Sequence, residues 1–133
     1  MRSKIFSCFV ISLVISIVGS RADMKPEDSQ LDGYAIFNDL PKEDAAKKGR
    51  EMAENDFAKN IYRIFVVGRR PLQNAYDDFL KERYGVVVTA IAGCVVSDGI
   101  MGAEEGYNST MKPLLNRKFG HDIFKEAEEA NRK

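Results

Sequence analysis

The sequence contains few of the residues that most often carry out nucleophilic or metal chemistry. Its 133 residues include two cysteines, Cys8 and Cys94, and one histidine, His121. Cys8 lies in an N-terminal segment that we expect to be removed, so no intramolecular disulfide is expected in the mature chain. Any Cys–His nucleophilic pair would have to be Cys94 and His121. Because Cys94 is flanked by Ala, Gly and Val, we instead expect a buried, unreactive thiol at that position.

An excess of charge of either sign is also missing. The chain has 20 basic and 20 acidic residues and a formal net charge of zero. It therefore lacks the basic excess typical of nucleic-acid-binding proteins, and nucleic acid is not an expected partner. Loss of Arg2, Lys4 and Arg21 with the N-terminal segment would leave the mature chain with a net charge of about −3.

The sequence has no uncharged run long enough for a membrane-spanning helix. Residues 5–18 form an apolar run of about 14 residues, whereas a span needs about 20. This run follows two basic residues, an order typical of a signal peptide. Ser20 and Ala22 supply small residues for a cut after Ala22, and a cut two residues earlier is an alternative. We therefore predict a signal peptide at residues 1–22, with an uncleaved anchor as the alternative, and a secreted or periplasmic protein whose mature domain does not insert into the membrane.

The remaining chain is predicted to form one domain after a short lead-in. Residues 23–33 are polar, contain Pro26 and show no hydrophobic period, which indicates a flexible segment. Residues 34–133 are long enough for one hydrophobic core without disulfides, and they contain no internal repeat. We predict a single α/β domain over this range.

Two segments are predicted to be buried strands. Residues 61–67 are rich in β-branched and aromatic residues and end at Gly68. Residues 86–96 carry no charge, which favours a strand covered on both faces. An amphipathic helix opened by Pro71 and ended by Gly85 connects them. The order predicts a βαβ unit with parallel strands, and antiparallel pairing is the alternative.

A further helix is predicted ahead of the first strand. Residues 41–60 are rich in Ala, Lys and Glu with an apolar face, and Asp39 is the expected cap. Residues 34–37 are a candidate third strand. With these elements, we expect two or three mostly parallel buried strands packed with about four helices.

Two more helices are expected after the second strand. A glycine-spaced stretch at 97–106 is interpreted as a connection, followed by a helix at 107–119. Pro113 must lie in the first turn of that helix or kink it. Gly120 is expected to end it, and Asp122 to cap the last helix.

Two clusters of charged residues are expected at the carboxyl ends of the predicted strands. Arg69 and Arg70 follow the first strand and precede a helix N-terminus, which favours an anion site. Residues 97–108 follow the second strand and carry three carboxylates. Because ligands bind outside the carboxyl ends of parallel strands, we expect the two clusters to share one cleft. The candidate ligand-binding residues are Arg69, Arg70, Asp98, Glu104, Glu105, Tyr107 and Asn108.

Ordinary structural roles are the alternative for each cluster. The arginines could be solvated or paired with Asp77, Asp78 or Glu82, and residues 97–108 could form a loop and helix caps. Residues 108–110 also fit the acceptor pattern for N-glycosylation. Neither cluster has the glycine pattern of a phosphate or dinucleotide loop or the spacing of a metal site, so no cofactor and no metal are expected.

These patterns lead to two competing hypotheses about function. The lack of a complete catalytic constellation favours an exported binding or protein-interaction domain, whose partner would be an envelope or secreted protein or a small anionic ligand. The alternative is a small carboxylate-dependent hydrolase or lyase that uses residues 97–108 with Arg69 or Arg70 to stabilise negative charge. A redox role of Cys94 is a third, weaker hypothesis.

Overall fold

The computed structural model describes residues 33–68 and 74–132. The predicted signal peptide (1–22) lies outside this part, as do all but the last residue of the predicted lead-in (23–33) and the arginine cluster at 69 and 70. The elements, in chain order, are η1 (Ala35–Phe37), α2 (Lys42–Ala58), β1 (Arg63–Val67), α3 (Ala75–Tyr84), β2 (Val87–Ala92), α4 (Asp98–Phe119) and α5 (Ile123–Asn131). The α/β class is therefore confirmed.

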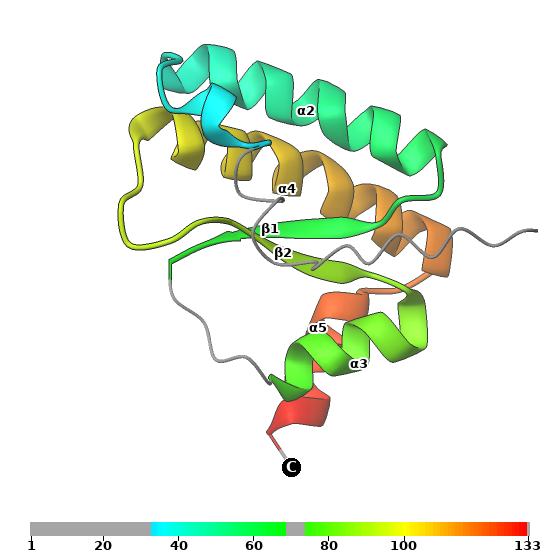
Figure 1. Ribbon diagram of the computed structural model, residues 1–133. Coiled ribbons are helices and arrows are strands. Elements are labelled where there is room, and N and C mark those ends of the chain that lie inside the picture. Colours follow the sequence, from blue (N-terminus) through cyan, green and yellow to red (C-terminus); the bar gives the residue numbers. More distant parts are fainter. Residues whose placement is uncertain (1–32, 69–73, 133) are drawn as a thin grey trace, which may run out of the picture.

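The four α-helices of the described residues lie in layers around a two-stranded sheet (Figure 1). Helix α2 packs on α4, and α4 packs on β1. On the other side of the sheet, α3 contacts β2 and lies beside α5. Within the ranges described, no helix combines the length and the apolar character that a membrane crossing requires.

The predicted βαβ unit is present, and its strands are parallel. The register runs from Arg63 opposite Val87 to Val66 opposite Ala90, with an irregularity after Val66. The segment predicted at 61–67 forms β1, which begins later than predicted, at Arg63, and ends at Val67 as predicted. The connecting helix ends at Gly85, as predicted, because this residue adopts a left-handed conformation in which glycine is unstrained.

Helix α3 begins later than predicted. Its first residue is Ala75, and the side chain of Asn74 caps it by accepting a hydrogen bond from the Tyr76 N–H at 3.0 Å. Pro71, which we expected to open this helix, lies outside the described residues. An asparagine cap satisfies an N–H group that the first turn leaves without a partner, which accounts for the start at this position.

Two predictions about strands are wrong. The segment at 34–37 forms the 3-10 turn η1 instead of a third strand. The strand expected over 86–96 is shorter, because β2 ends at Ala92, and it is not covered on both faces. Val87 is 45% exposed, and Ala90 is also exposed. With only two strands in the described sheet, β2 lies at an edge, where side chains reach solvent.

The glycine-spaced stretch at 97–106, predicted to be a connection, instead forms the first turns of α4. The side chain of Ser97 caps this helix by accepting from the Ile100 N–H at 3.2 Å. A Cβ atom at Gly102 or Gly106 would collide with a backbone carbonyl of α2, and one at Gly99 would collide with the carbonyl of Phe37, which precedes α2. These glycines share one face of α4 because they are spaced by three and four residues, so they permit close helix packing.

The other helix boundaries give a mixed result. Helix α2 begins at Lys42 with Pro41 at its N-cap and no side-chain cap, so the expected capping by Asp39 is not found. Pro113 lies in the interior of α4, on its exposed side, since the helix starts earlier than expected. Gly120 ends α4 as predicted. Asp122 caps α5 as predicted, accepting from the N–H groups of Phe124 and Lys125 at 3.1 Å.

Candidate functional site

The seven predicted site residues fall into two groups. Arg69 and Arg70 lie outside the described residues, so their part of the expected cleft has no description. The other five lie along α4, from its first turn to its middle. Asp98 is exposed in the first turn, where a carboxylate interacts favourably with the positive end of the helix dipole.

Asn108 is positioned to satisfy the backbone of the sheet. Its Oδ1 accepts from the Phe65 N–H at 2.8 Å, and its Nδ2 donates to the Phe65 carbonyl at 2.7 Å. Nδ2 also donates to Glu104 Oε1 at 3.2 Å. The amide thus uses its acceptor and donors within the fold, and Glu104 supports its orientation.

Tyr107 is a buried residue with a structural environment. Its ring stacks on Phe65 with centroids 3.7 Å apart, and its hydroxyl donates to Asp56 Oδ2 at 2.7 Å. Burial, and then the hydrogen bond to Asp56, raise the pKa of the Tyr107 phenol far above its usual value. The phenol therefore stays protonated at neutral pH and joins α4 to both β1 and α2.

Glu104 and Glu105 remain accessible, and they line the same hollow. This open hollow of about 610 Å³ follows one side of α4. It is lined by Met101, Glu104, Glu105, Asn108, Ser109, Lys112 and Pro113. Two of the predicted carboxylates therefore lie together, and the structure adds a basic residue, Lys112, that was not among the predicted site residues.

An adjoining hollow of about 360 Å³ lies between α2 and α4. It shares Glu105 and Ser109 with the first hollow and adds Lys42 and Arg50 from α2. Glu105 pairs with Lys42 at 3.0 Å, and both side chains are largely exposed. We call the two hollows together the α4 groove. The groove has charges of both signs, an exposed methionine and an exposed proline.

The helical spacing of the groove residues could have been found in the sequence. Met101, Glu105, Asn108 and Lys112 are spaced by four, three and four residues, which places them on one face of a helix. The glycines at 99, 102 and 106 obscure this pattern in the sequence, because closely spaced glycines are typical of a loop.

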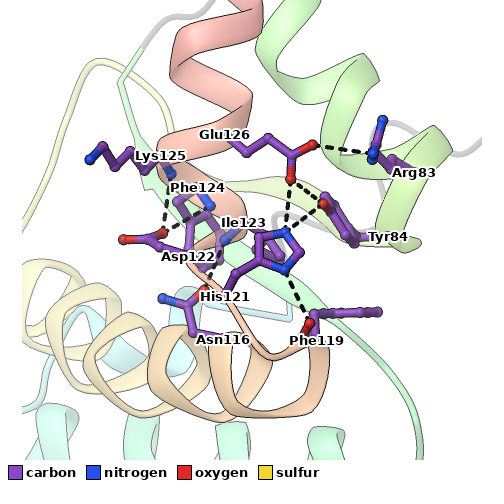
Figure 2. A network of polar contacts seen from close by, with 10 residues as sticks. All are labelled: Arg83, Tyr84, Asn116, Phe119, His121, Asp122, Ile123, Phe124, Lys125 and Glu126. Carbon is purple, nitrogen blue, oxygen red and sulfur yellow. Dashed lines mark hydrogen bonds and ion pairs between the residues drawn. The ribbon is translucent and has the colours of Figure 1, made fainter.

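A second polar cluster links the end of α3 to the start of α5 (Figure 2). His121 Nε2 lies 2.8 Å from Glu126 Oε2 and 2.9 Å from the Tyr84 hydroxyl. The Tyr84 hydroxyl donates to Glu126, and Arg83 lies 3.3 Å from the other carboxylate oxygen. His121 Nδ1 is 3.1 Å from the Phe119 carbonyl.

Hydrogen bonds within this cluster shift the pKa values of two of its members, Glu126 and Tyr84. The hydrogen bond from Tyr84, and then that with His121, lower the pKa of Glu126 below its usual value. Burial, and then the hydrogen bond to Glu126, raise the pKa of Tyr84. Glu126 therefore stays a carboxylate and Tyr84 a neutral donor, which is the arrangement of a stabilising link between two helices.

The prediction of a buried Cys94 is wrong, because the thiol is exposed. Strand β2 ends at Ala92, so Cys94 lies in the connection to α4 instead of in the sheet. His121, the other member of the hypothetical pair, is engaged with Tyr84 and Glu126. In the parts of the chain that the structure describes, no group of three His, Cys, Asp or Glu side chains is arranged to hold a metal ion.

The chain was compared with protein-family models, with curated proteins and with solved structures. No family model matches it, and neither search found a significant match.

Proposed function

We propose that this chain is a small exported binding domain, and that the α4 groove receives an extended segment of a secreted or envelope protein. The observation that carries this proposal is the groove itself, an open surface that exposes Met101 beside Glu105 and Lys112. An open, mixed surface of this kind suits a peptide segment better than a small ligand, because small-ligand sites are mostly enclosed.

The use of the predicted polar residues within the fold also supports binding over catalysis. Tyr107 is buried and protonated, Asn108 is bonded to Phe65, and Glu105 is paired with Lys42. Groups that are engaged in this way have little freedom to transfer protons to a substrate. The export part of the proposal is supported by the order of residues 1–22, and mass spectrometry of the native protein tests it by locating the mature N-terminus.

The binding proposal is tested by capture from the secreted and envelope fractions, followed by affinity measurements with the identified partner. Met101→Asp and Glu105→Arg change the groove without touching the core, so each should weaken binding by about tenfold or more. Glu128→Arg, an equal charge change at an exposed position of α5, is the matched control. Equal effects of Glu105→Arg and Glu128→Arg would show that the groove is not the binding site.

A small carboxylate-dependent hydrolase or lyase is the second candidate. The observation that favours it is the shared position of Glu104 and Glu105 beside Lys112, which could stabilise negative charge. The arginines of this mechanism, Arg69 and Arg70, lie outside the described residues. Turnover of an ester, glycoside or phosphate substrate that Glu104→Gln and Glu105→Gln abolish, but that Glu128→Gln leaves intact, would favour this candidate over the binding domain.

A further inference from the structure

The two edges of the sheet differ in whether their backbone groups have partners in the described chain. Strand β1 pairs with β2 on one side, and on its other side the Asn108 amide bonds both backbone groups of Phe65. Asn108 therefore takes the place of a neighbouring strand at this point of β1. No strand of the described chain lies along the outer edge of β2.

The backbone alternation identifies which groups of β2 point outward. The Val87 N–H bonds the Tyr62 carbonyl at 2.9 Å, so Val87 faces β1. Because successive residues of a strand point their N–H and C=O groups to opposite sides, Val88 and Ala90 point away from β1. The outer edge of β2 therefore offers these groups to a further strand.

The strand that forms this edge and the residues that flank it carry no charge. Residues 86–96 contain no charged side chain and no proline. Val87 is 45% exposed, Val95 is 88% exposed, and Ala90 is also exposed. Sheet edges of monomeric proteins are usually protected by charged residues, prolines or bulges. β2 contains neither charged residues nor prolines, and the irregularity, where β2 has one residue more than β1, comes after Ala90, so the outward groups of Val88 and Ala90 precede it. This part of the edge therefore has the properties of an interface.

We propose that β2 pairs with β2 of a second copy of this chain. A two-fold axis perpendicular to the sheet would bring the same edge of both copies together with the strands antiparallel. A charge-free edge suits this occupant, because pairing with an identical surface brings no like charges together. The dimer has a four-stranded sheet, a more typical size than two strands. This surface shares no residue with the α4 groove, so the two proposals can be tested separately.

The first test is the mass of the full chain by sedimentation equilibrium over a range of concentrations. The wild type should be a dimer. Ala90→Pro removes an N–H that the β1 pairing does not use, and it should raise the dimer dissociation constant by at least about tenfold. Ala90→Val keeps the N–H and should stay dimeric. Circular dichroism checks that each variant folds. If Ala90→Pro does not fold, Val87→Lys is compared with Val87→Thr in place of the two Ala90 variants.

Amide hydrogen exchange provides a second test with an internal control. Protection of the Ala90 amide should increase with protein concentration, whereas the Val87 amide, which bonds Tyr62, should be protected at every concentration. A wild-type chain that is monomeric at all concentrations would overturn the proposal. A folded Ala90→Pro variant that dimerises as the wild type does would also overturn it.

Discussion

The side-chain amide of Asn108 pairs with both backbone polar groups of Phe65, at 2.8 and 2.7 Å. Phe65 lies in the middle of β1, and its ring stacks on that of Tyr107, which precedes Asn108 in α4. Two successive residues of α4 thus hold the backbone and the side chain of one strand residue. The middle of β1 therefore has its outward backbone groups satisfied without a third strand.

Loss of the Asn108 amide should destabilise the fold. Asn108→Ala leaves the N–H and carbonyl of Phe65 without their partners, and we expect a loss of about 1–3 kcal/mol in the free energy of unfolding. Urea denaturation measures this change. Ser109→Ala, at the exposed next position of α4, is the control and should cost less than about 0.5 kcal/mol. Equal effects of the two variants would contradict the structural role of Asn108.

An alanine at Gly106 should also destabilise the protein, against its helix propensity. In an exposed helix the change would stabilise by about 1 kcal/mol. Here the new Cβ would collide with the backbone of Ala46, so we expect a net loss of about 2 kcal/mol or more. Thermal and urea unfolding measure it, with Lys112→Ala on the exposed side of α4 as control. A stabilised Gly106→Ala variant would show that α2 and α4 do not pack so closely.

The cluster around Glu126 should make stability depend on pH in the acid range. The pKa of Glu126 is lowered in the folded protein, so its contribution to stability is complete above the ordinary value of 4.5. It is lost as the pH falls through the lowered value. In Glu126→Gln, the free energy of unfolding should therefore decrease less steeply as the pH is lowered. Glu128→Gln serves as the matched control variant on α5. Identical pH profiles for both variants would contradict the prediction.

Tyr107 should ionise only when the protein unfolds. Its raised pKa means that the unfolded chain loses this proton near pH 10 while the folded chain keeps it. Its contribution to stability is thus complete below about pH 10 and is lost above that pH. Phenolate absorbance at a pH just above 10 measures this in the folded protein, where Tyr107→Phe should leave the signal unchanged. A reduction with Tyr107→Phe would refute the buried environment.

Several parts of the fold were predictable because they depend on neighbouring residues. The apolar segment at 61–67, the left-handed stop at Gly85 and the capping by Asp122 are local features. The parallel pairing follows from the helix that connects the strands, since a short turn does not join parallel strands. The glycines at 99–106 misled because a glycine that permits close packing and one that breaks a helix look the same in sequence.

The candidate site was only partly predictable. Glu104 and Glu105 share a groove, as their common segment suggested, but Lys112 belongs to it only because the segment is helical. The contacts of Tyr84 with His121 and Glu126 span about 40 residues of sequence, and no periodicity connects them.

The sequence by itself determined the βαβ unit and the helix ends at Gly85 and Gly120. These features follow from local conformational preferences and from composition. Only the tertiary structure decided that Asn108 bonds the outward backbone groups of Phe65, that Cys94 is exposed and that Gly102 and Gly106 face α2. The physical reason is that each of these depends on which backbone lies across from the residue, and a backbone contact between distant segments leaves no pattern in either segment alone.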